Sequence, residues 1–393
     1  MLVEFGARAM KHRSRQARAP ADKVEGLIRP HPEERSKSAS RRRGRPTLRD
    51  VARSQVYAGY ACCGASSAQG RERRSSSLRK DYYDSLEIDN PDLRERDLFG
   101  RLPNLIALAL SGAGWARQLN GIDPNSVTSR EALGQIPVLH AEDWPALRGE
   151  YPPFGGFVVP QRRRTRRLLM SPGPVFHPDV DGTDVGGAAR ALFAAGMRAG
   201  DVGLNCFSYH LSPFGFLMDS GAHALGCTVI AAGSDDAVTV ADVMQKLAPS
   251  AFVGPADFLK RLLDVSDSPS EMSIKHALIA NSPLTPALRR GFASAGIDVQ
   301  ECLTHPDIGI IAYESDARDG MIVNEGLIVE IVRPGSGEPV ADGEVGEIVV
   351  TAFNPDYPMI RLATGQLSAV MRGRSPCGRT NMRIKGVLGP APA

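Results

Sequence analysis

Apolar residues recur at helical spacing where the chain first takes on globular character. The stripe consists of Leu98, Leu102, Leu105 and Ala109, which are separated by four, three and four positions. This spacing puts the four side chains on one face of a helix, so we expect helical structure within residues 82–119. Pro103 has no amide hydrogen, and we expect it to break this stretch or to open a second helix.

Between residues 166 and 296, short apolar runs alternate with amphipathic ones. We expect strands at 166–170, 202–209, 227–233, 250–254 and 275–282. We expect helices at 188–199, 214–225, 240–248, 258–265 and 285–296. Strands that alternate with helices predict an α/β fold with a mainly parallel sheet and helical crossovers. Ligands bind such sheets beyond the carboxyl ends of the strands.

The pattern changes after this α/β region. Residues 326–333 and 346–353 are rich in β-branched residues, and the segment between them is filled with Pro, Gly and Asp. We therefore predict an antiparallel hairpin with a long loop.

Composition narrows the class of protein. The chain has 393 residues, of which 42% are hydrophobic, 6% aromatic and 23% charged, and these values are typical of globular proteins. We find no uncharged apolar run of about 18 residues, so a membrane-spanning helix is not expected. The first residues lack the apolar stretch of a secretory signal, and six cysteines in a chain of this length do not make a disulfide scaffold. We expect a cytoplasmic protein that does not enter a membrane.

The net charge of +3 conceals a division of the chain. Residues 1–80 hold 20 Lys and Arg against 7 Asp and Glu, a net of +13, so the remainder carries −10. Residues 1–79 are predicted to form a basic and mostly disordered tail. Binding to nucleic-acid phosphates is one function for this tail. We favour a solvated tail, or upstream sequence translated from an early start codon, because no element that stacks on or reads bases accompanies the charge.

General motifs exclude several enzyme classes. The chain has no G-x-x-x-x-G-K-[ST], no G-x-S-x-G and no H-E-x-x-H motif, which argues against a Walker-type NTPase, a typical α/β-hydrolase and a zincin. Cys206 with His210 and Cys302 with His305 offer four zinc ligands, but neither spacing is a strong metal signature. Buried, inert cysteines are the alternative that we favour.

Several segments together resemble the phenylacetate–CoA ligase branch of the AMP-forming adenylating enzymes. The matching segments are 205–233, 250–264, 326–367 and 377–389. The most specific match is the hairpin followed by PMIRLATGQL, together with CGRTNMRI near the end. The resemblance implies the large N-terminal domain of the adenylate-forming fold over residues 80–368, with mainly parallel sheets flanked by helices and a β-hairpin or small barrel region.

The resemblance also implies a reaction. A carboxylic acid, often aromatic in this branch, attacks the α-phosphate of ATP, and the thiol of coenzyme A then displaces AMP from the acyl-adenylate. Mg²⁺ normally bridges the phosphates. Residues 369–393 correspond to the start of a hinge, whereas the family's lid domain and its catalytic lysine have no counterpart in this sequence. Because a lid excludes water and completes the site, we expect impaired chemistry.

Two motifs carry the implied nucleotide contacts. Ser171 and Gly173 lie where the family has its phosphate loop, although the neighbouring Pro172 and Pro174 remove two amide donors. A plain turn is the alternative. The sequence THPDIG (304–309) lies where the family stacks adenine and holds Mg²⁺. Asp307 is the predicted metal ligand and catalytic carboxylate, with Gly309 beside the nucleotide.

The remaining residues come from the same resemblance. Tyr209, His210 and Gly254 are predicted to wall the acid pocket, although Tyr209 and His210 also suit an ordinary core. Arg361 is predicted to be catalytic, and Gln366 and Arg379 to contact the nucleotide. Gln366 replaces the family's ribose-binding aspartate, so we expect nucleotide binding to be weaker by about 1–3 kcal/mol.

Two readings of the body therefore remain open. In the first, the chain is an acid–CoA ligase that uses ATP, Mg²⁺ and CoA. In the second, the fold is retained and binds nucleotide or acyl ligand without turnover. A homodimer is compatible with both.

Overall fold

The structure is a computed structural model that describes residues 81–140, 143–160, 165–172, 175–266 and 272–392. The basic tail predicted at 1–79 lies outside the described residues.

A nine-stranded mixed sheet organises the α/β region. Its order is β13 (Val370–Met371), β14 (Arg383–Ile384), β9 (Met321–Val323), β8 (Gly309–Glu314), β7 (Asp298–His305), β6 (His276–Ile279), β5 (Ala251–Gly254), β3 (Val202–Asn205) and β4 (Thr228–Ala231). The five strands from β7 to β4 are parallel, which confirms the predicted α/β sheet with helical crossovers. The strands from β8 to β13 extend the sheet in antiparallel fashion, and the sequence pattern did not predict this extension.

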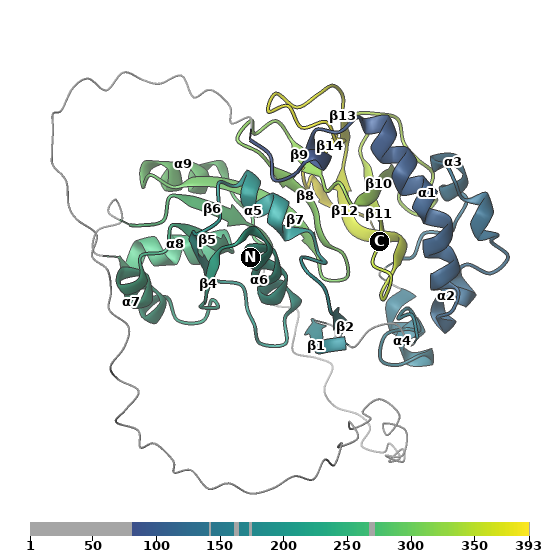
Figure 1. The fold of residues 1–393 in the computed structure, drawn as a ribbon, viewed down its shortest axis with the longest axis horizontal. Helices are drawn as coiled ribbons and strands as arrows, with labels where there is room; N and C mark the ends of the chain where they lie inside the picture. The colour runs from purple at the N-terminus through teal and green to yellow at the C-terminus, as the bar shows by residue number, and fades with distance from the viewer. Residues whose placement is uncertain (1–80, 141–142, 161–164, 173–174, 267–271, 393) are drawn as a thin grey trace, which may run out of the picture. The chain divides into compact units, whose positions relative to one another are not determined.

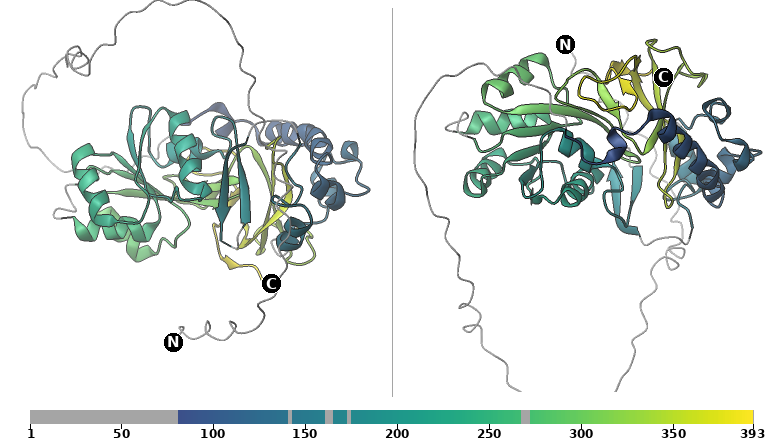
Figure 2. Two further views of the ribbon diagram at one scale, coloured as in Figure 1. Left: turned by 90° about the horizontal axis from the view of Figure 1, so that it is seen from below. Right: turned by 45° about the horizontal axis from the view of Figure 1, so that its top comes forward.

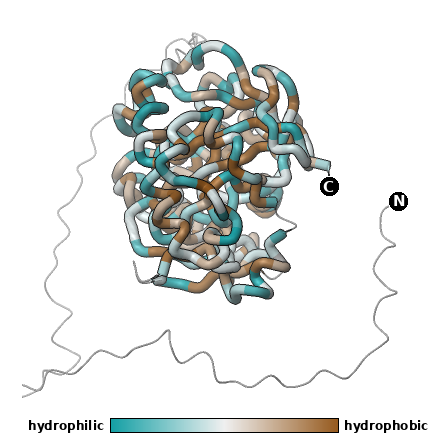
Figure 3. The backbone as a smooth tube through the Cα atoms, turned by 90° about the vertical axis from the view of Figure 1, so that its right-hand side faces the viewer, coloured by the Kyte–Doolittle hydropathy of each residue, from teal (hydrophilic) through white to brown (hydrophobic). Residues whose placement is uncertain are grey.

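Helices cover both faces of this sheet (Figure 1, Figure 2). They are α5 (Ala188–Ala194), α6 (Pro213–Leu225), α7 (Ala237–Leu247), α8 (Ala256–Val265) and α9 (Pro286–Ser294). In β5, Ala251 and Val253 pack with α5 and α6, whereas Phe252 packs with the other three helices. Successive side chains of a strand point to opposite faces, so an entirely apolar strand is the natural choice between two helical layers. Hydrophobic and hydrophilic stretches alternate along the chain accordingly (Figure 3).

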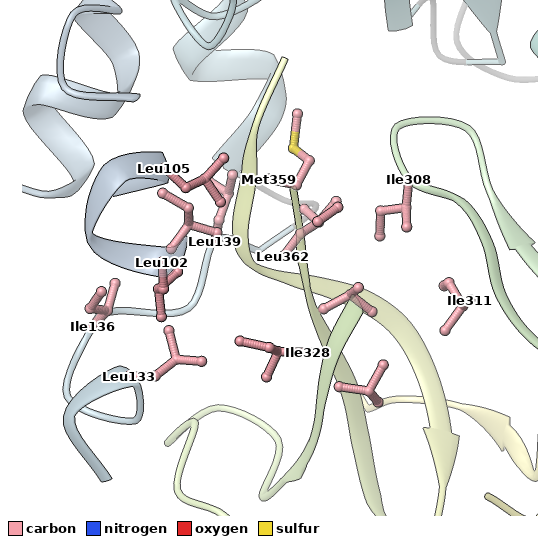
Figure 4. Close-up of a cluster of buried hydrophobic side chains, with 14 of the residues drawn as sticks. Leu102, Leu105, Leu133, Ile136, Leu139, Ile308, Ile311, Ile328, Met359 and Leu362 are labelled. Carbon is pink, nitrogen blue, oxygen red and sulfur yellow. The ribbon is translucent and has the colours of Figure 1, made fainter. Parts of the chain in front are cut away.

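A four-stranded antiparallel sheet forms a second core. It consists of β10 (Leu327–Val332), β11 (Gly346–Ala352), β12 (Met359–Ser368) and β15 (Gly389–Pro390). The pairing of β10 with β11 confirms the predicted hairpin. Five short helices and turns precede or flank this core: η1 (Ser85–Glu87), α2 (Ala113–Gln118), η2 (Pro124–Ser126), α3 (Arg130–Leu133) and α4 (Trp144–Glu150). Side chains from the N-terminal helices meet those of the sheet in one apolar cluster (Figure 4).

The helix α1 (Pro91–Ala109) corrects one prediction, because it runs without interruption through Pro103. A proline inside a helix costs about 3 kcal/mol. Leu102 and Ile106 on either side of Pro103 are fully buried, and each contributes about 1.5–3 kcal/mol. Packing of the apolar stripe therefore outweighs the missing hydrogen bond.

A small hairpin completes the fold. The predicted strand at 166–170 is β1 (Thr165–Ser171), and it pairs with β2 (Val175–Val180), a strand that the pattern did not indicate. Ser171 is the last residue of β1 and lies opposite Val175. None of the helices in the described part of the chain combines the length and apolarity that a membrane crossing requires.

Candidate active site

A cavity of about 1010 Å³ lies where β2, α6 and three loops converge. The loops are 181–187, the turn after β7 and the segment 352–357 after β11. The turn after β7 is at the carboxyl end of a parallel strand, where α/β sheets bind ligands. The volume is at the upper end of the range that small-molecule and cofactor sites occupy.

Asp307 lies in the turn between β7 and β8 and lines this cavity. Its side chain is only 3% exposed, and its Oδ1 accepts hydrogen bonds from His177 Nδ1 at 2.6 Å and Tyr357 Oη at 2.9 Å. Burial by itself raises a carboxyl pKa, but the hydrogen bond and the charge of His177 bring the pKa of Asp307 below its ordinary value. Asp307 is thus an ionised acceptor that two donors hold in place.

His177 connects Asp307 to Ser171. The imidazole is 2% exposed, and its Nε2 lies 2.7 Å from Ser171 Oγ. An ionised carboxylate only accepts, so Nδ1 carries a hydrogen, and in the neutral form of the ring Nε2 accepts the Ser171 hydroxyl. Ser171, His177 and Asp307 therefore form one directed chain of hydrogen bonds.

Other titratable groups surround this chain. Burial lowers the pKa of His305 against the opposing effect of Asp307, and burial raises the pKa of Tyr357 well above its ordinary value. The guanidinium of Arg148 lies 4.2 Å from the centre of the Trp144 ring, and its charge acts on both His305 and Tyr357. The neutral forms of His305 and Tyr357 are favoured, so Asp307 keeps the negative charge of the group.

The predicted role of Asp307 as a metal ligand stays a prediction. Its Oδ1 already serves two donors, and the described residues contain no group of three or more His, Cys, Asp or Glu side chains that could hold an ion. Mg²⁺ that accompanies a nucleotide is usually held by one or two carboxylates together with phosphates and water, so such a group is not required. We assign no metal to these residues and derive no chemistry through one.

Gly309 lies at the cavity, as predicted. Its φ is +95°, and a Cβ atom there would lie 2.4 Å from the carbonyl oxygen of Gly186, which is also a lining residue. Backbone meets backbone at this point, so only glycine fits. The approach fixes the turn after β7 against the loop before α5.

Two further predicted residues belong to the β1–β2 turn. Ser171 is part of the hydrogen-bonded chain, whereas Gly173 lies outside the described residues. The hydroxyl of Ser171 is bonded to His177 here, and the predicted phosphate contact of this residue stays a prediction.

Arg361 is not at the cavity, which contradicts the catalytic role that the resemblance implied. Its side chain is 2% exposed, Nε donates to Glu330 at 3.1 Å, and Nη2 donates to the Gly337 carbonyl at 2.7 Å. Nη1 donates to the carbonyls of Gly134 and Ile136. Every nitrogen of the guanidinium is used inside the core, so none is left to contact a ligand.

Arg379 is also a core residue and does not line the cavity. Its Nε donates to Glu87 at 2.6 Å, and Glu87 also accepts from the hydroxyl of Tyr313 at 3.2 Å. Tyr313 bonds Glu325 at 3.0 Å, and burial raises the pKa of Glu325 to about 7. The predicted nucleotide contact by Arg379 is therefore corrected to a structural role in a buried ionic cluster.

Gln366 lies in β12 beside Pro390 of β15, and it is not among the residues that line the cavity. Its Oε1 is buried and has no hydrogen-bond partner among the described residues. The replacement of the family's aspartate thus leaves an amide with an unused acceptor rather than a ribose site on the cavity wall.

The predicted acid-pocket residues do not line the cavity. Tyr209 Oη donates to Asp219 at 2.7 Å, His210 is exposed, and a Cβ at Gly254 would lie 2.8 Å from the Phe252 ring. Tyr209 is connected to the cavity only by this hydrogen bond, because Asp219 is a lining residue. The wall predicted from this strand end is instead made by α6.

The cysteines of the zinc hypothesis are inert. Cys206 and Cys302 are buried free thiols, and burial raises the pKa of both. No cluster of metal ligands among the described residues includes either of them. Burial of both thiols agrees with the alternative of ordinary core cysteines.

Sequence analysis did not anticipate His177 and Tyr357. His177 follows an apolar residue in an unremarked strand, and Tyr357 lies in a Pro-rich loop more than 170 positions away. A histidine six residues after a serine was the only local signal in the sequence. Neither residue belongs to a sequence motif. They come together only in the folded chain, where both contact Asp307 in the turn after β7.

Comparison with protein-family models gives no match. Among curated proteins, the chain is 29% identical over 310 residues to the phenylacetate-coenzyme A ligase of Thermus thermophilus, covering 74% of this chain and 68% of that protein. It is 29% identical over 286 residues to the ligase of the same name from Aromatoleum evansii, and 26% identical over 284 residues to that of Escherichia coli. These two matches cover 68% of this chain and 63% and 64% of the relatives. The chain thus spans about two thirds of the length of these relatives.

Solved structures show the same architecture. A structure of 2-hydroxyisobutyryl-CoA ligase in complex with an acyl-AMP in the postadenylation state superposes with a TM-score of 0.74, covering 81% of this chain and 72% of that chain at 20% identity. An open conformation of the ligase in complex with 2-HIB-AMP and CoA has a TM-score of 0.72, covering 79% and 74%. At this level of identity the likeness establishes the fold.

Proposed function

The chain is a distant homologue of the phenylacetate-coenzyme A ligases with the fold of the acyl-CoA ligases, and from this premise we propose that it activates a carboxylic acid with ATP. The product is an acyl-adenylate, whose acyl group passes to the thiol of coenzyme A. The observation that carries the proposal is the cavity of about 1010 Å³ at the carboxyl end of β7, within the chain's homologous body.

The cavity wall offers an apolar surface for a carbon skeleton and a separate place for an anionic group. Leu169, Val180, Phe214, Phe216 and Leu217 supply apolar surface, which suits the carbon skeleton of an aromatic acid. The amino end of α6 also opens on the cavity, and helix amino ends favour carboxylate and phosphate groups.

The proposal includes ATP delivered as its Mg²⁺ complex and a cytoplasmic location. Magnesium enters as the companion of the phosphates. Light scattering of the purified chain decides between a monomer and the homodimer that the sequence left open.

Acid-dependent pyrophosphate exchange tests this function. The full chain is incubated with ATP, labelled pyrophosphate and a panel of aryl acids that includes phenylacetate. We expect exchange to rise well above the acid-free rate. Leu217→Trp adds bulk to the cavity wall and should reduce the rise, whereas Val265→Trp puts the same side chain on an exposed position of α8 and should not.

A second candidate is a binding protein without turnover. The engagement of Asp307 by His177 and Tyr357, and the position of Gln366 away from the cavity, favour it. ATP binding in calorimetry without any acid-dependent exchange would establish this alternative, and the absence of both would reject both functions.

A further inference from the structure

The hydrogen-bonded chain of Ser171, His177 and Asp307 has the order and spacing of a nucleophile, its base and the group that orients the base. The two links measure 2.7 Å and 2.6 Å, within the range of about 2.6–3.2 Å that such pairs require. We propose that Ser171 is the nucleophile of an ester- and thioester-cleaving site, with His177 as general base and Asp307 as a positioning residue.

The position of the serine supports this assignment. Ser171 and Leu169 are two residues apart on β1, so their side chains point to the same face of the hairpin. Leu169 lines the cavity, and its partner across the hairpin is His177, also a lining residue. Ser171 itself is part-exposed at the strand end, so its hydroxyl is bonded to the base without being sealed in the core.

The orienting carboxylate is held more firmly than the other two members. Asp307 is buried, and its Oδ1 accepts from Tyr357 at 2.9 Å as well as from His177. Because Nδ1 of His177 donates to Asp307, Nε2 of the neutral ring carries no hydrogen and can take the serine proton. Arrangements of this kind recur on unrelated folds and in different chain orders, so neither a G-x-S-x-G elbow nor a hydrolase fold is required.

The reaction balances without any cofactor. Ser171 Oγ forms a bond to the carbonyl carbon of a carboxylic ester or thioester, and its proton moves to His177 Nε2. The C–O or C–S bond to the leaving group breaks, and the alcohol or thiol departs with that proton. Water then attacks the acyl-serine, passes a proton through Nε2 back to Oγ, and releases the carboxylic acid.

The residue after the nucleophile sets the expected speed. Pro172 has no amide hydrogen to offer a developing oxyanion, and loss of one such donor slows acyl transfer by about 100–1000-fold. We therefore expect slow turnover, which makes covalent labelling of Ser171 the primary readout. Neither labelling nor cleavage requires ATP, so the outcome is independent of the proposed ligase function.

The test treats the intact 393-residue chain with a fluorophosphonate probe, maps the adduct by mass spectrometry and follows p-nitrophenyl acetate cleavage in parallel. We expect the adduct on Ser171, none in Ser171→Ala, and labelling slower by about 100-fold or more in His177→Gln and Asp307→Asn. Ser294→Ala, on an exposed site of α9, should label like the unaltered chain. Tyr357→Phe removes the other bond to Asp307 and should slow labelling by only a few fold.

Circular dichroism and thermal melting establish that each variant is folded, and labelling of the unaltered chain does not depend on any variant. An adduct that forms on other serines but never on Ser171 overturns the proposal. Equal labelling rates in folded His177→Gln and the unaltered chain overturn it too, because the histidine would then be only structural.

Discussion

Two carboxylates of this molecule are buried beside a basic side chain, yet their pKa values are shifted in opposite directions. Burial raises the pKa of Glu330 in spite of its ion pair with Arg361 at 3.1 Å. The pKa of Asp307 is lowered in spite of even deeper burial. The difference lies in the donors, because Arg361 divides its hydrogen bonds between Glu330 and three carbonyls, whereas His177 and Tyr357 both donate to Asp307.

The two carboxylates therefore differ in what their hydrogen bonds connect them to. The Arg361–Glu330 pair is closed, in the sense that both side chains are buried in the core and neither lines the cavity. The Asp307 group is open, since its chain of bonds ends at a part-exposed serine hydroxyl. Resemblance alone assigned catalytic roles to both Arg361 and Asp307, and only the direction of their hydrogen bonds distinguishes them.

Breaking the closed pair should have the largest effect. Arg361→Met leaves Glu330 buried and unpaired, and we expect the free energy of unfolding to fall by about 3–5 kcal/mol. Denaturant titration measures the change. Arg333→Met removes an exposed arginine and should change stability by less than about 0.5 kcal/mol. A loss below about 1 kcal/mol in Arg361→Met would contradict the structural role.

A third buried carboxylate, Glu325, shows how burial shifts a carboxyl pKa when the basic partner is more distant. Glu325 accepts from Tyr313 at 3.0 Å and lies 3.8 Å from Arg190, and burial raises its pKa from 4.5 to about 7. Between these values the folded state holds a proton that the unfolded state has released, so stability falls as pH rises from 4.5 to 7. The total is on the order of 3 kcal/mol, at about 1.4 kcal/mol per pH unit.

Unfolding titrations at several pH values measure this slope. Glu325→Gln carries no titratable proton, so its stability should depend less on pH across the same window. Parallel curves for the two proteins would show that Glu325 is ionised in the folded state and that its pairing resembles that of Asp307.

The position of the Asp307 group depends on a backbone contact between Gly309 and Gly186, which a methyl group at residue 309 should disturb. Gly309→Ala combines a left-handed φ with a collision against Gly186, and we expect a loss of about 1–3 kcal/mol. Gly233→Ala has a similar φ of +69° with open space around it, so it reports the strain alone. Equal losses in the two variants would mean that the turn after β7 adapts to the extra atom.

The smallest expected effect concerns the second donor to Asp307. Tyr357→Phe removes one hydrogen bond, and we expect about 1 kcal/mol of lost stability. A double-mutant cycle with Asp307→Asn measures the coupling between the two side chains. Additive losses would indicate that the tyrosine does not help to hold the carboxylate.

Much of the architecture was predictable because local patterns correspond to local causes. The alternation of apolar strands and amphipathic helices over 188–296 predicted the parallel α/β sheet, since each element buries the face that its period defines. The predicted strand at 166–170 instead belongs to the separate β1–β2 hairpin. The β10–β11 hairpin followed from two β-rich runs with a turn-forming segment between them. Pro103 was misjudged because the energy that keeps α1 intact comes from packing against another element, which no local pattern contains.

For the site, the sequence by itself pointed to two motifs, Ser171 with Gly173 and the segment THPDIG that contains Asp307 and Gly309. It did not determine what surrounds them. The assembly of Ser171, His177, Asp307 and Tyr357 depends on a hairpin, a β7–β8 turn and a loop after β11 that meet only in the folded chain. Tertiary structure also decided that Arg361 and Arg379 are core residues, because the donors and acceptors that surround a charge are set by segments distant in sequence.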